Sequence, residues 1–424
     1  MSSEAEQPPS GEPQEEEEDE VLPLTEEQVK ALAEAQAQAI AEADAHAGLG
    51  AVAVQLTMQA GEEAEAEVDF IGEVSWDVEV TDTTESFDID LHVLYRSPPG
   101  AHGGEWKTLA EGKERHSEGV AHTHDEEAKD DKETVATLLL KLSNAHSYKN
   151  AKTVSLRIAP QPGSRLVSSR LPAEEPLRNA VAAALAGTYL KRDEKLPADT
   201  LKVLQVQRIQ DDAKLREYTA VLQDISSRRS DEECARRITD LAVKTEGFGL
   251  PSCFKSCGES WLFHGTSADS VDGIVRTGFD ISGSAGSRKK GTIFGTGVYF
   301  AECASKADLY SIPVPHPSGK SEVCCMLLCR VALGRYIMSQ DLRPDGERLQ
   351  SLVKKGEYDS VVGDRERLQK SYREFVVQSS DAIYPDFIIK YERVEPTVFQ
   401  RWRRYHFGET NFFDSRIDPG NGRS

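Results

Sequence analysis

The chain has 424 residues, a length that suggests about three structural units. Lys and Arg number 50 and Asp and Glu number 72, and the net charge of −22 argues against a nucleic-acid coat or a basic membrane-surface protein as the role of the whole chain. No run of residues approaches the roughly 18 to 20 apolar positions of a membrane helix, and no secretory signal is expected, because the first residues lack a basic start and an apolar stretch. All 7 cysteines lie between Cys234 and Cys329, and their odd number favours an intracellular protein with reduced thiols.

The first part of the chain is expected to be disordered and then helical. Residues 1–24 form an acidic, Pro-rich tail with too few apolar side chains to fold. Residues 25–48 are dense in Ala, Glu and Gln, and Thr25 can cap a helix that Gly48 and Gly50 end. The apolar face of this helix is mostly Ala, so it is either a solvated spacer or a segment that binds a partner.

Residues 50–160 show an alternation of apolar and polar side chains that predicts an antiparallel β-sandwich. The stretch from Gly112 to Lys132 is highly charged and is expected to be a long loop. Its three histidines could capture a metal ion, but a solvated loop without fixed geometry is the favoured interpretation. The alternating runs are 74–80, 87–93, 137–142 and 153–158.

Three segments of this region resemble the GOLD domain, a β-sandwich of trafficking and lipid-handling proteins that usually serves as a binding module. They read VSWDVEVTDTTESFDIDLHVLYRS, EWKTLAEGKER and LLLKLSNAHSYKNAKTVSLRI, and the last parallels the family's closing Asn-x-x-Ser segment and final strand. The resemblance implies a GOLD-like sandwich over residues 50–160 that recruits a protein partner or a membrane.

Residues 161–194 are expected to form a linker and a helix, because Pro, Ser and Arg dominate up to Glu175 and a helical pattern follows at 177–190. Residues 195–395 mix strands with short helices. This region opens on LKVLQVQRIQDDAKLREYTAVLQDI, which predicts a strand that runs into an amphipathic helix. The expected fold class is therefore multidomain, with an all-β sandwich followed by an α+β domain.

Two segments of the α+β domain suit a flat ligand. His264, Gly265 and Thr266 end a hydrophobic strand, where an imidazole beside open backbone N–H and C=O groups can meet an amide. FGTGVYF then combines turn glycines with a strand that presents Tyr299, and Tyr310 follows across a short helix. Two such aromatic rings can enclose a planar ring.

A carboxylate interrupts the β-rich run YREFVV at Glu374, and a carboxylate on a strand is either exposed or functional. Asp386, in the segment YPDF, is a competing acid.

Seven blocks of the α+β domain, in order, resemble the catalytic domain of the poly(ADP-ribose) polymerases, which are diphtheria-toxin-like ADP-ribosyltransferases. The family's catalytic signature is His-Tyr-Glu, and the resemblance assigns it to His264, Tyr299 and Glu374. Glu374 is preferred to Asp386, because the family's Glu lies on the strand before the Tyr-Pro-acid-aromatic strand and both strands are visible here. The blocks are VLQVQRIQ, HGT, FGTGVYFAECASKADLY, LLCRVALGRYI, YDSVVGD, YREFVV and IYPDFIIKYER.

The resemblance implies that NAD+ is the co-substrate. His264 would bind its ribose hydroxyls, the Gly265 backbone, with Thr266 beside it, would pair with the nicotinamide carboxamide, and Tyr299 and Tyr310 would stack on the nicotinamide ring.

One cofactor-binding position departs from the family pattern, because Ala307 stands where many members have a Ser that bonds the carboxamide. A lost hydrogen bond costs about 0.5–1.5 kcal/mol, so the departure predicts a weaker affinity for NAD+.

The function implied is that of an NAD+-dependent protein ADP-ribosyltransferase, a poly(ADP-ribose) polymerase that modifies protein acceptors, itself included, and releases nicotinamide. Glu374 would stabilise the positive charge that develops on the ribose, and a Glu at this position permits polymer formation. A mono(ADP-ribosyl)transferase with the same site is the first alternative. A scaffold whose catalytic fold binds NAD+ poorly is the second.

No metal is expected, because neither the adjacent Cys324 and Cys325 nor the pair Cys253 and Cys257 has the spacing of a structural zinc site. Residues 283–291 form a loop whose basic side chains either contact the NAD+ phosphates or are solvated. Residues 396–424 form a basic, aromatic tail that either packs back on the domain or binds single-stranded nucleic acid.

The segment before the α+β domain is too short for the helical domain of the DNA-damage-sensing members, so activity independent of DNA is expected. Without a basic localisation run, the cytoplasm is favoured over the nucleus.

Overall fold

The structure, a computed structural model, describes residues 50–81, 89–96, 105–123, 135–145, 150–190, 198, 200–228, 242–281, 293–315 and 321–394. Four features expected from the sequence lie outside the described residues, and they stay predictions. They are the acidic tail of residues 1–24, the helix of residues 25–48, the basic loop of residues 283–291 and the basic, aromatic tail of residues 396–424.

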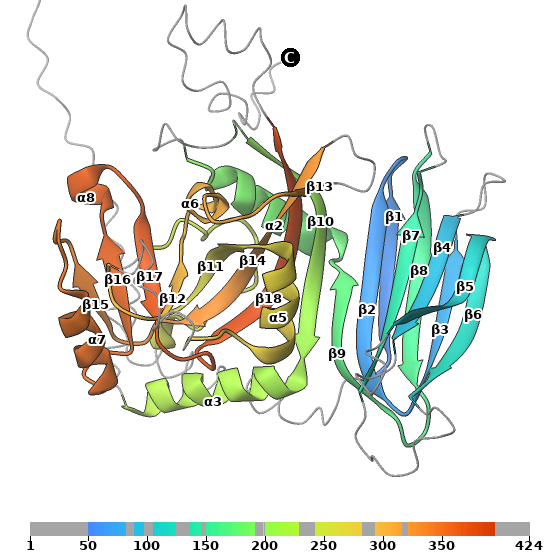
Figure 1. Cartoon of the computed structure of the whole chain (residues 1–424), viewed down its shortest axis with the longest axis horizontal. Coiled ribbons are helices and arrows are strands. Elements are labelled where there is room, and N and C mark those ends of the chain that lie inside the picture. The colour runs from blue at the N-terminus through green and yellow to red at the C-terminus, as the bar shows by residue number, and fades with distance from the viewer. Residues whose placement is uncertain are drawn as a thin grey trace, which may run out of the picture.

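The N-terminal β-region, strands β1 to β8, encloses a core between two layers of sheet (Figure 1). One layer has the strand order β1-β8-β3-β6, and the other, β2-β7-β4-β5, is one end of a ten-stranded sheet. Buried residues alternate with exposed ones along β1, as the sequence period predicts. The strands are β1 (Val52–Met58), β2 (Glu63–Ile71), β3 (Glu73–Val80), β4 (Ile89–Arg96), β5 (Trp106–Glu114), β6 (His116–His122), β7 (Ala136–Ser143) and β8 (Lys152–Pro160).

The prediction of a loop from Gly112 to Lys132 is wrong as far as His122. The end of β5 and the whole of β6 occupy this stretch, and β6 pairs with β3. The side chains of β6 are mostly exposed because β6 is the last strand of its sheet, so its sequence lacks the apolar repeat that marks a strand.

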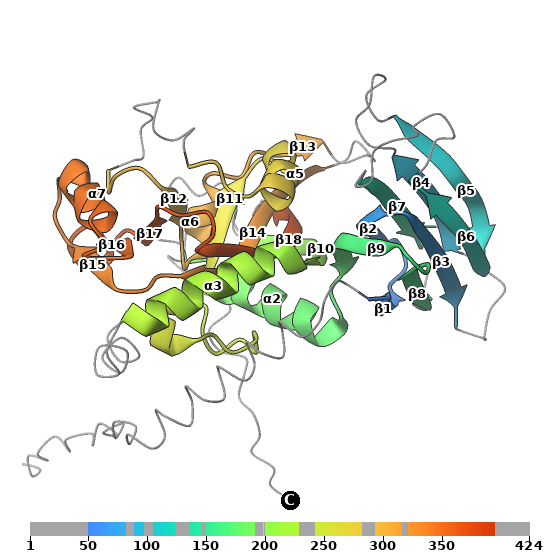
Figure 2. The ribbon, with the colours of Figure 1, turned by 90° about the horizontal axis from the view of Figure 1, so that it is seen from below.

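The predicted linker contains a strand as well. Arg165–Pro172 form β9, which pairs with β2 on one side and with β10 (Thr200–Asp211) on the other. The ten-stranded sheet therefore runs without a break from the N-terminal β-region into the rest of the chain, and β9 stands between the two in both views (Figures 1 and 2). The polar composition suggested a linker, but Ser168, Ser169 and Arg170 of β9 are buried among polar partners, and Arg170 pairs with Asp272.

The second half of the chain builds on the other end of this sheet, in the order β11-β14-β18-β10. Successive residues of β14 point to opposite faces, so Cys324 joins the core beside α2 and Cys325 joins the core beside α3 and α5. The strand-to-helix step from β10 to α3 and the helix at α2 agree with the sequence pattern. These elements are α2 (Glu175–Gly187), α3 (Asp212–Arg228), η1 (Lys255–Cys257), β11 (Glu259–Thr266), α5 (Ala268–Thr277), β13 (Val314–Pro315), β14 (Glu322–Ala332) and β18 (Ile383–Val394).

A small third sheet, in the order β12-β17-β16-β15, completes the fold and meets β11 through a backbone bridge between Phe263 and Ala301. No helix of the described residues is both long enough and apolar enough to span a lipid bilayer. The remaining elements are β12 (Val298–Phe300), α6 (Ala304–Asp308), β15 (Tyr336–Ser339), α7 (Gly346–Lys354), β16 (Ser360–Asp364), α8 (Glu366–Gln369) and β17 (Arg373–Val377).

Candidate active site

His264 lies near the end of β11, and its ring is held by one hydrogen bond and two aromatic neighbours. Its Nδ1 donates to the carbonyl oxygen of Tyr299 at 2.9 Å. The ring centroid is 5.1 Å from that of Phe279, edge to face, and 5.5 Å from that of Phe300. Burial among these groups lowers the pKa of His264 below its ordinary value of 6.5, although the hydrogen bond to Tyr299 partly opposes this. The neutral imidazole, with its proton on Nδ1, leaves Nε2 as a hydrogen-bond acceptor.

A pH prediction follows for His264. Because its folded-state pKa lies below 6.5, the unfolded chain takes up the proton first as the pH falls, and stability declines below about pH 6.5. Because the pKa is lowered, the acceptor at Nε2 persists to a lower pH than it would in an ordinary imidazole, so we expect the KM for NAD+ to rise only below about pH 6.5. A Phe279→Ala variant should uncover the ring, raise the pKa of His264 and make KM rise toward pH 6. A wild-type KM that already rises below pH 7 would contradict this assignment.

Gly265 presents backbone groups at the open edge of β11. Both backbone groups of Phe263 pair with Ala301, at 2.8 and 2.9 Å, and the N–H and C=O of Gly265 point to the same side two residues later. A Cβ at Gly265 would lie 1.8 Å from the carbonyl oxygen of Ala307. Only glycine therefore fits here, and it leaves a donor and an acceptor side by side, which is the pattern that a primary carboxamide needs.

Tyr299 lies in the middle of β12, and its hydroxyl is tied to the preceding turn. It donates to the carbonyl oxygen of Gly295 at 2.7 Å and accepts from the N–H of Phe294 at 3.1 Å. Burial raises the pKa of Tyr299 well above its ordinary value of 10, so the side chain stays neutral. The turn fixes the orientation of the ring, and the nearby charge of Glu374 adds to the rise in the pKa of Tyr299.

The short helix α6 brings Lys306 and Tyr310 to the same place. The Lys306 ammonium lies 3.1 Å from the carboxylate of Glu374, 3.2 Å from the Tyr310 hydroxyl and 5.0 Å from the centre of the Tyr310 ring. Burial disfavours this ammonium, but Glu374 and Tyr310 together outweigh burial and the pKa of Lys306 is raised. The Tyr310 ring itself is 52% exposed and can accept a stacking partner. Ala307 abuts Gly265 from the same helix, and Thr266 ends β11 beside it.

Glu374 is 6% exposed on β17, and strand register sets its position. Tyr299 pairs with Val376, and Phe300 with Phe375. Because residues two apart on a strand share a face, Glu374 lies on the same face of the small sheet as Tyr299. Asp386, the competing acid, lies in another cluster, where it pairs with Arg330 at 2.9 Å beside Tyr384. The geometry supports Glu374 as the carboxylate of the site.

The residue before Glu374 is clamped from the opposite face of β17. Both oxygens of the fully buried Glu302 bind the guanidinium of Arg373, at 2.8 and 2.7 Å. Lys244 adds a contact to Glu302 at 2.6 Å. Because these ion pairs fix Arg373 on one face of β17, they also restrain the backbone of its neighbour Glu374, whose side chain lies on the other face.

The structure thus brings together all the site residues expected from the sequence, His264, Gly265, Thr266, Tyr299, Ala307, Tyr310 and Glu374. It adds three that the sequence analysis missed, Lys306, Phe279 and Glu302. The signal for Lys306 was its spacing of four residues from Tyr310, which places both on one side of a helical turn. The sequence around Phe279 and Glu302 does not identify them as residues that support the site, because their partners are far away in the sequence.

Within the part of the chain that the structure describes, no three His, Cys, Asp or Glu side chains gather as metal ligands would. The six described cysteines form no disulfide bond, and five of them are buried, as thiols in a core would be.

An α+β core with a His, two Tyr and a Glu around the open edge of a strand is the arrangement of an ADP-ribosyltransferase domain. Residues 184–393, just under half of the chain, match the family model of the poly(ADP-ribose) polymerase catalytic domain.

Among the curated proteins that the chain resembles are two mono-ADP-ribosyltransferases. The chain is 33% identical over 154 residues to the protein mono-ADP-ribosyltransferase PARP12 of Mus musculus, a match that covers 34% of this chain and 19% of the relative. It is 30% identical over 141 residues to the PARP12 of Homo sapiens, which covers 32% and 18%. The chain thus spans about a fifth of the length of the curated relatives that it matches.

Proposed function

We propose that the chain is an NAD+-dependent protein ADP-ribosyltransferase. The observation that supports this best is the convergence of three strands, β11, β12 and β17, which places His264, Tyr299 and Glu374 around one strand edge. Beside that edge, the backbone of Gly265 offers a donor and an acceptor for a carboxamide.

The residues fit NAD+ part by part. Nicotinamide would pair through its carboxamide with Gly265 and stack on the exposed ring of Tyr310, while Tyr299 would bound the other side. Nε2 of His264 is an acceptor and would take a hydrogen bond from a ribose hydroxyl. Ala307 supplies no hydroxyl for the carboxamide, so we expect weaker binding than in members with Ser at this position.

The reaction is a substitution at the ribose C1′ of the nicotinamide nucleoside. The bond from C1′ to the nicotinamide nitrogen breaks, nicotinamide leaves with the bonding electron pair, and positive charge builds on the ribose. The carboxylate of Glu374, held by Lys306 and braced through Arg373, stabilises that charge where it develops. The acceptor nucleophile then bonds to C1′ and loses its proton.

We favour the transfer of a single ADP-ribose unit over the formation of a polymer. A Glu at position 374 permits elongation to a polymer. The two PARP12 relatives are described as mono-ADP-ribosyltransferases, and this supports transfer of a single unit. Acceptors would be proteins, this chain included.

Automodification distinguishes these products. The purified full chain, incubated with radiolabelled NAD+, should give one sharp labelled band on a denaturing gel, and treatment with a poly(ADP-ribose) glycohydrolase should leave that band in place. A high-mass smear that the glycohydrolase collapses would establish a polymerase instead. Absence of label, of nicotinamide release and of NAD+ binding by calorimetry would leave the scaffold alternative.

We also propose that the N-terminal β-region is GOLD-like and binds a protein or membrane partner. Supporting this, its outer strands β5 and β6 expose three large apolar side chains, Trp106, Leu109 and Val120. Cytoplasmic residence and activity without DNA remain predictions, and a several-fold stimulation by nicked DNA would contradict the second.

A further inference from the structure

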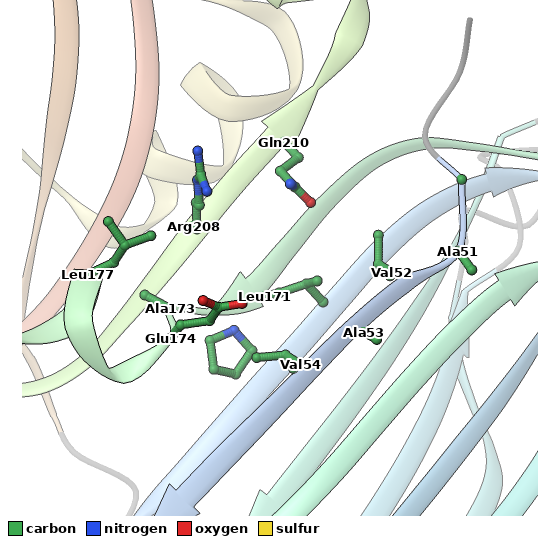
Figure 3. Close-up of a pocket in the computed structure, with 12 residues that line it drawn as sticks. Ala51, Val52, Ala53, Val54, Leu171, Ala173, Glu174, Leu177, Arg208 and Gln210 are labelled. Atoms are coloured by element: carbon green, nitrogen blue, oxygen red, sulfur yellow. The ribbon is translucent and has the colours of Figure 1, made fainter. Parts of the chain in front are cut away.

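The N-terminal β-region joins the catalytic domain through polar contacts as well as through the shared sheet. Apolar side chains do not fill the whole junction. At one side of it, a cavity of about 270 Å3 lies between the start of β1 and the elements β9, α2 and β10 (Figure 3). Val52 and Val54 line it from β1, Leu171 from β9, and Arg208 from β10. The charged side chains of β2 make other contacts between the N-terminal β-region and the catalytic domain.

The sequence of β2, EAEAEVDFI, alternates acids with small apolar residues. The even-numbered residues from Ala64 to Phe70 point into the core of the N-terminal β-region. Because neighbours on a strand point to opposite faces, Glu65, Glu67 and Asp69 lie on the other face, toward the catalytic domain. Three consecutive acids on that face would repel one another unless cations cover them.

Arg276, in the last turn of α5, covers two of these acids. Its Nη1 lies 3.0 Å from both carboxylate oxygens of Asp69, and its Nη2 binds Glu67. Arg170 of β9 approaches Glu67 as well and binds Asp272 of α5 at 2.6 Å. Burial raises the pKa of Asp69, but Arg276 together with the hydroxyl groups of Thr137 and Ser168 outweighs burial and the pKa is lowered. At Glu67 burial prevails over Arg170 and Arg276, and the pKa is raised. The helix α5 is thus bound to β2 by a largely buried contact whose ion pair is centred on Asp69 and Arg276.

The same helix is bound to the NAD+ site at both of its ends. It begins directly after β11, with Ser267 as its N-cap, three residues after His264. It ends at Gly278, which has a φ of 83°, and the next residue, Phe279, packs edge-on against the His264 ring. Arg276 is therefore three residues from the side chain that buries His264. A shift of the α5 C-terminus would move Phe279 directly.

We propose that Glu67 and Asp69 act through Arg276 as positioning residues for the NAD+ site, so that the N-terminal β-region is a working part of the transferase. The proposal rests on the function proposed above. Residues 184–393, the matched catalytic segment, contain Arg276 but neither acid, so the contact is supplied by the region outside that segment.

The test compares variants of the full chain that break different contacts across the same junction. Arg276→Gln should raise the KM for NAD+ by about threefold to tenfold with a smaller change in kcat, because a displaced α5 disturbs binding more than chemistry. The matched control is Lys390→Gln, which removes the contact between Lys390 of β18 and Glu65 of β2 without touching α5. Its KM should equal that of the wild type.

A second readout reports on His264 itself. In histidine-labelled protein, the imidazole signal lost in a His264→Asn variant identifies His264, and its titration gives the pKa. Arg276→Gln should move this pKa up toward 6.5, Arg276→Lys should restore most of the wild-type value, and Lys390→Gln should leave it unchanged. If Arg276 has a merely structural role, Arg276→Gln will lower thermal stability and leave the pKa of His264 unchanged, and this result would overturn the proposal.

Two features keep the test decisive. The variant Glu67→Gln/Asp69→Asn should reproduce the effects of Arg276→Gln on KM and on the pKa of His264, although it also weakens the contacts of these acids with Arg170, Thr137 and Ser168. Combining all three changes should alter KM and this pKa no further, because all three act on the same contact with α5. It also replaces Arg276→Gln if that variant fails to fold. If the wild type shows no transfer at all, the proposed function fails, but the titration of His264 still decides whether β2 positions this residue.

Discussion

Replacing Glu374 with Gln is expected to lower kcat by about 100-fold to 1,000-fold while NAD+ still binds, since removing one group aimed at developing charge typically costs about this much. The substitution keeps the shape of the side chain and removes its charge. The carboxylate is buried and paired with Lys306, so it is positioned before the reaction begins. Nicotinamide release at saturating NAD+ and NAD+ affinity by calorimetry separate the chemical step from binding.

Asp386→Asn is the matched control for Glu374→Gln. Asp386 is equally buried, at 2% exposure, and is also ion-paired, but with Arg330 on β14. Leaving Arg330 without its partner should lower the melting temperature, and the folded protein should keep a kcat near that of the wild type. If Asp386→Asn lost activity while Glu374→Gln kept it, the assignment of the catalytic carboxylate would be wrong.

Gly265→Ala is expected to abolish NAD+ binding or raise KM by at least about tenfold, a cost of about 1.4 kcal/mol or more. The new Cβ would lie 1.8 Å from the oxygen and 2.7 Å from the carbon of the Ala307 carbonyl, which are backbone atoms. The helix α6 would have to move away. It carries Lys306 and leads to Tyr310, so the same shift would disturb both the Glu374 ion pair and the stacking surface.

Gly273→Ala controls for the general effect of adding a methyl group. Gly273 lies within α5, nothing lies within 4 Å of its Cβ position, and Ala is preferred to Gly in a helix by up to about 1 kcal/mol. This variant should be as active as the wild type and slightly more stable. Calorimetric titration with NAD+ and thermal melting of both variants make the comparison, and normal binding by Gly265→Ala would exclude the proposed carboxamide contact.

Much of the candidate site could be predicted because its residues sit in short, ordered motifs. HGT, FGTGVYF and YREFVV each combine a special backbone residue or a lone polar group with a β-strand pattern. The apolar periodicity around them gave the strands β11, β12 and β17. The motifs alone do not show which residues lie together. Strand register shows this, since the pairing of Tyr299 with Val376 puts Glu374 on the face of the sheet that Tyr299 occupies.

The amino-acid sequence by itself determined the type of each element with a strong period, and it named the residues of the candidate site and the class of chemistry proposed for them, because these depend on local patterns and side-chain identity. Only the tertiary structure decided that β9 is a strand, that Lys306 holds Glu374, and that Arg276 meets Glu67 and Asp69 across more than 200 residues of chain. The reason is physical. A buried charge needs a partner close in space, and the sequence shows the charged residue but does not show which distant residue the fold brings beside it.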